Sequence, residues 1–98
     1  PYTTLFRSYR RVREILSDQY NLGSREPNIQ VWNVDLRGDR SLTLRHQAYM
    51  RRPMGGDAEE VVKHIGRLWG FPVRLEGVQD DGTVQKLHEW SPKHAQDA

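Results

Sequence analysis

The chain has 98 residues, no cysteine, a hydrophobic fraction of 36% and a formal net charge of +2. This length suits one domain whose core is just large enough to fold alone. The lack of cysteine excludes disulfides, thiolate catalysis and cysteine-based zinc sites. Because no signal-peptide pattern is present and no apolar run approaches the roughly 18 residues of a membrane span, we expect a cytoplasmic protein.

Charge is divided unevenly along the chain. Residues 1–52 carry ten arginines against five acidic residues, a charge of +5, whereas residues 53–98 carry five basic and eight acidic residues, a charge of −3. Arginine outnumbers lysine twelve to three. Since arginine favours fixed, bidentate contacts with carboxylates or phosphates, this bias indicates ion pairs within the fold or with a partner, or else a nucleic-acid contact.

Two helices are predicted from apolar residues at helical spacing. The first covers about residues 4–20, and its stripe consists of Leu5, Tyr9, Val12, Leu16 and Tyr20. The second begins at Asp57 and is stopped by Gly70, because glycine readily adopts the positive φ of a helix C-terminus. Its stripe consists of Ala58, Val61, Val62, Ile65, Leu68 and Trp69.

A first β-hairpin is predicted to join a strand over residues 29–36 to a strand over residues 40–46. A two-residue turn at Arg37-Gly38 would connect them. This register places Val31 opposite Leu44 and Asp35 opposite Arg40. The core face would then carry Ile29, Val31, Leu42 and Leu44, and the other face Gln30, Trp32, Val34, Ser41, Thr43 and Arg45.

A second hairpin is predicted from residues 73–78 and 83–89, with a turn at Asp80-Asp81-Gly82. In its register Leu75 lies opposite Leu87, Glu76 opposite Lys86 and Val78 opposite Val84.

The predicted order is helix–hairpin–helix–hairpin, an αββαββ pseudo-repeat of two similar halves. We expect a two-layer α+β sandwich, in which both helices cover one face of a four-stranded antiparallel sheet. Residues 1–90 would form this single domain and residues 91–98 a disordered tail. The chain opens without a methionine, and we expect it to be part of a longer protein.

The sheet face opposite the helices is the candidate binding surface. Its proposed binding residues are Gln30, Trp32, Thr43, Arg45, Arg74 and Lys86. Trp32 beside Arg45 would suit single-stranded nucleic acid, by base stacking and phosphate pairing. However, Val34, Val78 and Val84 would make this face partly apolar, which is more typical of a protein contact. We therefore expect protein docking, with nucleic-acid binding as the alternative.

Residues able to carry out chemistry are sparse. His46 and His88 are expected near each other at strand ends, but two histidines with a scattered carboxylate make a weak metal site. Glu60 and His64 are one helical turn apart and lack the second histidine of a zinc-protease motif. No nucleophile elbow or glycine-rich phosphate loop is present. We expect no catalytic residue, metal or cofactor, and no enzymatic activity.

Three strings in the sequence are distinctive: EPNIQVWNVD at residues 26–35, RGDRSLTLR at 37–45 and HIGRLWGF at 64–71. In these strings the chain resembles the C-terminal region of the SpoVR family (stage V sporulation protein R-like). The resemblance spans roughly Tyr9 to Glu89.

The resemblance implies the C-terminal domain of a cytoplasmic bacterial protein several times longer. It implies a role in forming the spore cortex or in a stress response. The implied partners are the N-terminal region of the parent protein, a PrkA-type serine protein kinase and a von Willebrand A-like protein. It supplies no catalytic motif for this region.

Overall fold

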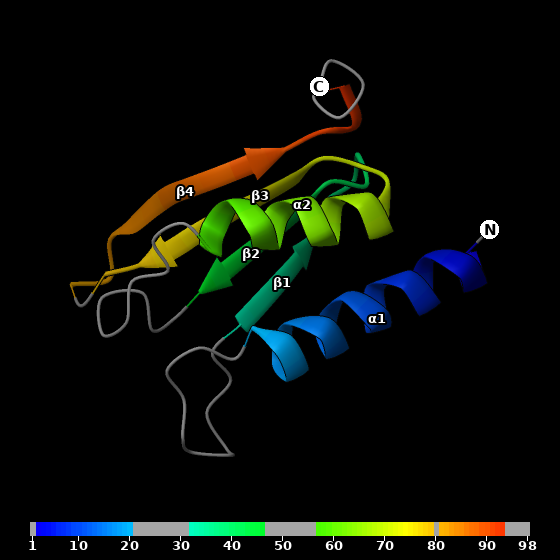
Figure 1. Ribbon diagram of the computed structural model, residues 1–98, viewed down its shortest axis with the longest axis horizontal. Helices are drawn as coiled ribbons and strands as arrows, with labels where there is room; N and C mark the ends of the chain where they lie inside the picture. Colours follow the sequence, from blue (N-terminus) through cyan, green and yellow to red (C-terminus); the bar gives the residue numbers. More distant parts are fainter. Residues whose placement is uncertain (1, 21–31, 47–56, 80, 94–98) are drawn as a thin grey trace.

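The computed structural model describes residues 2–20, 32–46, 57–79 and 81–93. In chain order they form α1 (Tyr2–Gln19), β1 (Trp32–Leu36), β2 (Leu42–His46), α2 (Asp57–Trp69), β3 (Val73–Val78) and β4 (Val84–Trp90). The strands make one four-stranded sheet in the order β1-β2-β3-β4, and both helices lie on the same side of it (Figure 1). The predicted α+β class and order of elements are confirmed.

The sheet is mixed, and the predicted fully antiparallel sheet is wrong. The strands of each hairpin are antiparallel, but β2 and β3 run parallel, with Leu42 beside Val73 and Leu44 beside Leu75. The physical reason is the connection: α2 crosses the sheet face and returns the chain to the end at which β2 began, so β3 starts in the same direction. The Leu42 N–H donates to the Pro72 carbonyl oxygen at 2.9 Å, where β3 begins.

One hydrophobic core fills the space between the helices and the inner sheet face. Its buried apolar members are Val12, Ile15, Leu16, Trp32, Leu42, Leu44, Ala58, Val61, Val62, Ile65, Trp69, Val73, Leu75 and Trp90. The helical stripes and the alternating residues of β2 and β3 thus meet largely as predicted. Leu68 is the exception in the second stripe, because it is 42% exposed and does not join the core. Gly70 ends α2 with a φ of 86°, and its N–H donates to the Gly66 carbonyl oxygen at 2.7 Å.

The register of the first hairpin differs from the prediction by three residues. Val34 lies opposite Leu44, and Trp32 lies opposite His46. Because side chains alternate between the two faces of a strand, an odd shift turns every side chain of β1 to the other face. Trp32 is therefore buried on the core side, and its predicted place on the outer face is wrong. Asp35 lies opposite Thr43, so the predicted pairing of Asp35 with Arg40 is wrong too.

The turn between β1 and β2 explains this shift. The Arg40 N–H donates to the Arg37 carbonyl oxygen at 2.9 Å, and the Arg37 N–H donates to the Ser41 carbonyl oxygen at 3.0 Å. The loop therefore has three residues, 38–40, rather than two. Arg40, not Gly38, takes the left-handed conformation, with a φ of 71°, as the third residue of such loops does.

The second hairpin matches its prediction at two of three positions. Val78 lies opposite Val84 and Glu76 opposite Lys86, but a β-bulge places Leu75 opposite His88 instead of Leu87. The predicted pseudo-repeat of two equivalent halves is not confirmed.

Some predictions fall on residues outside the described ranges. Ile29, Gln30 and Val31 of the first predicted strand are among them. Residues 94–98 are too, so the predicted disordered tail stays a prediction.

Candidate interaction surface

The outer sheet face, which neither helix covers, carries two rows of polar side chains across the strands. One row runs through Asn33, Arg45, Glu76 and Lys86, and the other through Asp35, Thr43, Arg74 and Glu89. Three basic and three acidic residues alternate in these rows, so their formal charges cancel. The outer face is thus a mixed-charge surface rather than a basic one.

An arginine–glutamate–arginine group lies at the centre of this face. Arg45 donates from Nε (3.3 Å) and Nη2 (3.1 Å) to Oε1 of Glu76, and Arg74 donates from Nε to Oε2 at 2.9 Å. The Glu76 side chain is 11% exposed, against 43% for Arg45 and 45% for Arg74. A nearly buried carboxylate therefore holds two half-exposed guanidinium groups in fixed positions.

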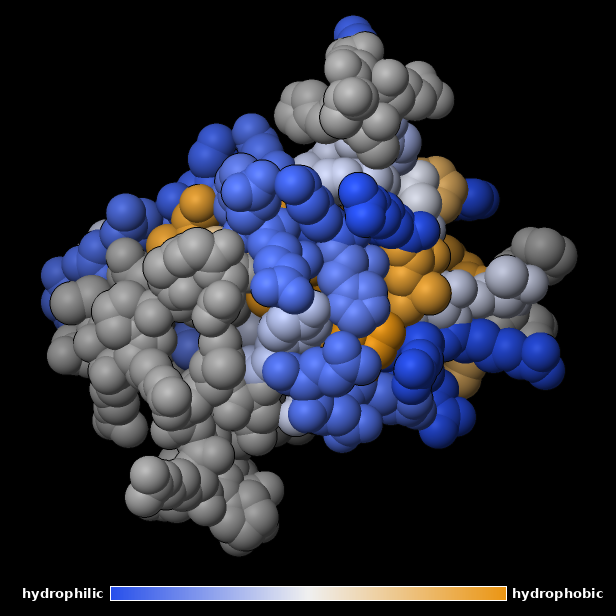
Figure 2. Space-filling view, in the orientation of Figure 1, coloured by the Kyte–Doolittle hydropathy of each residue, from blue (hydrophilic) through white to orange (hydrophobic). Residues whose placement is uncertain are grey.

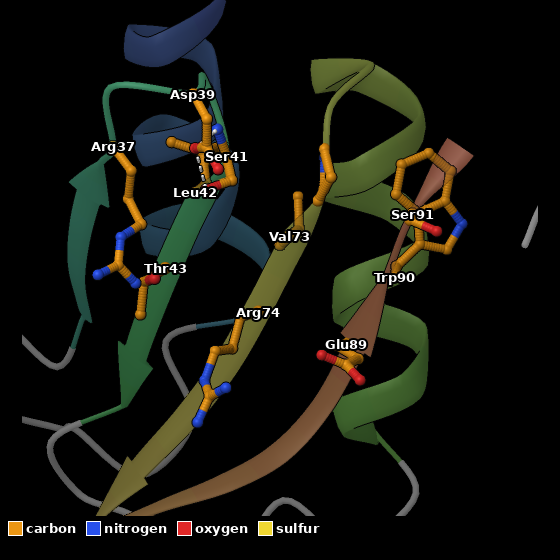
Figure 3. Close-up of a pocket in the computed structure, with 11 residues that line it drawn as sticks. Arg37, Asp39, Ser41, Leu42, Thr43, Val73, Arg74, Glu89, Trp90 and Ser91 are labelled. Atoms are coloured by element: carbon orange, nitrogen blue, oxygen red, sulfur yellow. Dashed lines mark hydrogen bonds between the residues drawn. The ribbon is translucent and has the colours of Figure 1, made fainter. Parts of the chain in front are cut away.

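Beside this group the face is hollowed at the end of the sheet that carries the β1–β2 turn. The hollow has a volume of about 380 Å³ and is lined by residues of the turn, by residues of β2, β3 and β4, and by Pro72 and Ser91. Arg37 and Arg74 extend along the sheet near Thr43, and Glu89 lies beyond Arg74 on β4 (Figure 3). No ion pair of Arg37 within 4.0 Å is present among the described residues.

A protein-family comparison matches residues 27–80 to the SpoVR-like C-terminal domain. The chain belongs to the SpoVR-like family. It is also 54% identical over 85 residues to the uncharacterized protein YcgB of Escherichia coli strain K12. That match covers 87% of this chain but only 17% of YcgB, so the chain spans about a sixth of its relative's length. No solved structure matches the chain.

The SpoVR-like domain brings four of the six predicted binding residues together. Thr43, Arg45, Arg74 and Lys86 share the outer face across three neighbouring strands. Trp32 lies on the opposite side of the sheet, and Gln30 lies outside the described residues. Glu76 was not among the predicted binding residues, because its pairing with Arg45 depends on the parallel contact between β2 and β3.

The outer face is less apolar than expected. Val34 belongs to the inner face, where the Tyr9 hydroxyl donates to its carbonyl oxygen at 2.9 Å. Val78 and Val84 remain as an apolar pair at the far end of the outer face. Stacking on Trp32 is excluded by its burial, since the side chain is 8% exposed and faces the core.

The three histidines that the structure describes, His46, His64 and His88, lie on the helix side of the sheet. His46 is fully buried, with its ring centroid 4.8 Å from that of Trp32. His64 shares a hydrogen bond of 2.9 Å between its Nδ1 and the Tyr20 hydroxyl. Within residues 2–20, 32–46, 57–79 and 81–93, no three histidine or acidic side chains are grouped to hold a metal ion.

In the same ranges, no helix is long and apolar enough to cross a membrane.

Among the described residues, three carboxyls have a lowered pKa, and the cause in each case is a hydrogen bond from a residue close in sequence. Hydrogen bonds from the Ser41 hydroxyl and N–H lower the pKa of Asp39, and those from Thr83 lower the pKa of Asp81. A hydrogen bond from Lys63 lowers the pKa of Glu59. These carboxyls stabilise two turns and one helix, and they lie at three separate places in the fold.

Proposed function

We propose that this SpoVR-like domain is a non-catalytic interaction domain that docks through the outer face of its sheet. The observation that carries the proposal is the Arg45–Glu76–Arg74 group on a face that neither helix covers. Glu76 orients both guanidinium groups, while their remaining N–H donors stay available to a partner's carboxylates. Side chains held on strands give more precise recognition than side chains on loops.

The partner with the strongest support is the rest of the parent polypeptide. The chain matches only 17% of its E. coli relative, so a full-length SpoVR-like protein offers a large surface to this domain. A PrkA-type serine protein kinase and a von Willebrand A-like protein are the further partners that we propose. We place the complex in the cytoplasm, in spore-cortex formation or a stress response.

The alternative, binding of single-stranded nucleic acid through the same face, has weaker support. Non-specific nucleic-acid binding needs an excess of positive charge along the backbone path, and the two polar rows carry balanced charges. It also needs aromatic platforms for the bases, and Trp32 faces the core.

Charge reversal on the outer face tests the proposal in the full-length protein. The variant carries Arg74→Glu and Lys86→Glu, and its control carries Lys63→Glu, which changes an equally exposed lysine on α2. We expect the first variant to capture purified partner proteins at least tenfold more weakly, and the control to capture them normally. Chemical cross-linking should also join Lys86 to the rest of the polypeptide.

Unchanged capture by the Arg74→Glu, Lys86→Glu variant, together with no cross-link from Lys86, would overturn the proposal. A titration with single-stranded RNA at two salt concentrations tests the alternative. Binding that weakens steeply with salt, and that the same charge reversal abolishes, would favour nucleic acid over a protein partner.

A further inference from the structure

An exposed apolar patch lies on the helix side of the molecule, away from the outer sheet face. Phe6 is 50% exposed, Leu68 42% and Leu36 39%. The space-filling view shows apolar atoms gathered between α1 and the C-terminal end of α2, bordered by strongly hydrophilic side chains (Figure 2). We call Phe6, Leu36 and Leu68 the end patch.

Contacts among the elements bring these three residues to one end of the fold. The Tyr9–Val34 hydrogen bond sets α1 along β1, so Phe6, one turn before Tyr9, lies toward Leu36. The indole N–H of Trp69 donates to the Arg40 carbonyl oxygen at 2.6 Å, which places the last turn of α2 over the β1–β2 turn.

Leu68 lies on the side of α2 that faces α1. It is one turn after His64 on the same side of the helix, and His64 is bonded to Tyr20 at the end of α1. The Tyr20–His64 hydrogen bond thus joins the C-terminal end of α1 to the middle of α2, and Leu68 lies one turn beyond it, toward the end of the fold that carries Phe6 and Leu36. The result is an apolar surface between two helices that neither of them covers.

Arginines surround the end patch. Arg10 follows Phe6 by one turn, Arg67 precedes Leu68, and Arg40 lies with its guanidinium 5.5 Å from the centre of the Phe71 ring. All three are exposed, and among the described residues none has a carboxylate within 4.0 Å. The first turn of α1 holds no acidic residue, so its helix dipole adds to the positive potential.

We propose that the end patch binds an acidic amphipathic helix supplied by another part of the full-length SpoVR-like polypeptide. Apolar side chains on one face of such a helix would cover Phe6, Leu36 and Leu68, and flanking carboxylates would pair with Arg10 and Arg67. A second copy of the chain fits less well, because a symmetric contact would set arginines against arginines. We assign the helix to the same polypeptide because this chain accounts for only 17% of its E. coli relative. Most of a full-length protein of that length would therefore lie outside this domain and could supply the helix.

Peptide binding to the 98-residue chain tests the chemistry of this site. The probe is a labelled 18-residue helix-forming peptide with leucine on one face and glutamate beside it, and the matched probe has lysine in place of glutamate. We expect the acidic peptide to bind at least tenfold more tightly than the basic one, and less tightly as salt rises. The Leu68→Ser and Arg67→Glu variants should each bind the acidic peptide at least tenfold more weakly than the parent chain.

Val84→Ser is the matched control, because Val84 is 43% exposed, like Leu68, but lies on the outer sheet face. It should leave binding unchanged, and circular dichroism of each variant checks the fold. Equal binding of both peptides, or full binding by Leu68→Ser, contradicts the proposal. A dimer that Leu68→Ser dissociates would assign the patch to a second copy, and selective binding of anionic vesicles would assign it to a membrane surface.

Photo-cross-linking in the full-length protein tests the source of the helix. Benzoylphenylalanine replaces Leu68, with a control in which it replaces Thr83, which is exposed beside the β3–β4 turn at the opposite end of the sheet. We expect position 68 to cross-link within the same polypeptide, to an acidic segment outside this domain. Cross-links from position 68 to a second copy of the protein would overturn this assignment. The same holds if position 68 gives no cross-links that the control position does not also give. The outer sheet face takes no part in this test, so failure here leaves the proposed docking through that face standing, and the reverse also holds.

Discussion

Trp32 packs edge-on against the fully buried ring of His46, with ring centroids 4.8 Å apart and ring planes at 76°. The indole N–H donates to the Tyr20 carbonyl oxygen at 2.9 Å. Trp32 therefore joins β1, β2 and the end of α1, and its contribution is to the fold.

Replacing Trp32 should destabilise the domain strongly. We expect Trp32→Ala to lower the free energy of unfolding by about 3–5 kcal/mol, as truncation of a buried tryptophan does. Trp32→Phe should lose less, about 1–2 kcal/mol, because it keeps an aromatic ring but loses the hydrogen bond. Urea denaturation followed by circular dichroism measures both. A Trp32→Ala variant with unchanged stability would show that the indole is not in the core.

Gly66 should be intolerant of a larger side chain because Trp90 packs directly on it. A Cβ at this position would overlap the indole of Trp90. We expect Gly66→Ala to lower the free energy of unfolding by about 1–3 kcal/mol, the usual penalty of overpacking, although alanine favours helices. In a Trp90→Leu background the same change should be neutral or stabilising, and a double-mutant cycle by denaturation measures the difference. Equal effects in both backgrounds would contradict the contact.

Arg40 should respond to substitution in an unusual order. Its φ of 71° is strained for any residue with a Cβ, and its guanidinium lies over Phe71. Arg40→Ala keeps the strain and loses the ring contact, whereas Arg40→Gly loses the contact but relieves the strain. We therefore expect the glycine variant to be more stable than the alanine variant by about 1 kcal/mol. Thermal unfolding compares the two, and the opposite order would refute the three-residue loop.

Stability should fall in acid partly through the two hairpin turns. Asp39 and Asp81 have pKa values below the ordinary 3.8 in the folded chain. Each therefore stabilises the fold above its unfolded pKa and loses that contribution as the pH falls through the lower, folded value. We expect the double variant Asp39→Asn, Asp81→Asn to lose less stability than the parent between about pH 5 and pH 2.

Denaturation midpoints across this pH range measure the effect. Asp18→Asn is the control, because Asp18 is exposed on α1 and makes no hydrogen bond with the described residues. Parallel pH profiles for the parent and the double variant would show that the two turns do not contribute to the loss of stability in acid.

Local pattern alone determined the order and type of the elements. The helical stripes, Gly70 and the alternation of β2 and β3 each depend on near neighbours in the chain, so helical period, turn propensity and strand alternation suffice. The strings at residues 26–35, 37–45 and 64–71 likewise pointed to the SpoVR-like family, which the comparison over residues 27–80 confirmed.

Tertiary structure decided the sheet direction, the face of β1 and the shape of both candidate surfaces. The parallel pairing of β2 with β3 depends on the path of α2, and it alone brings Arg45 to Glu76. The loop length at Arg40 set the odd shift that buried Trp32. The end patch depends on how α1 and α2 pack on the sheet, because that packing leaves Phe6, Leu36 and Leu68 exposed. A periodic apolar pattern predicts which residues face the core. Only the packing of the elements decides which of these apolar residues remain exposed.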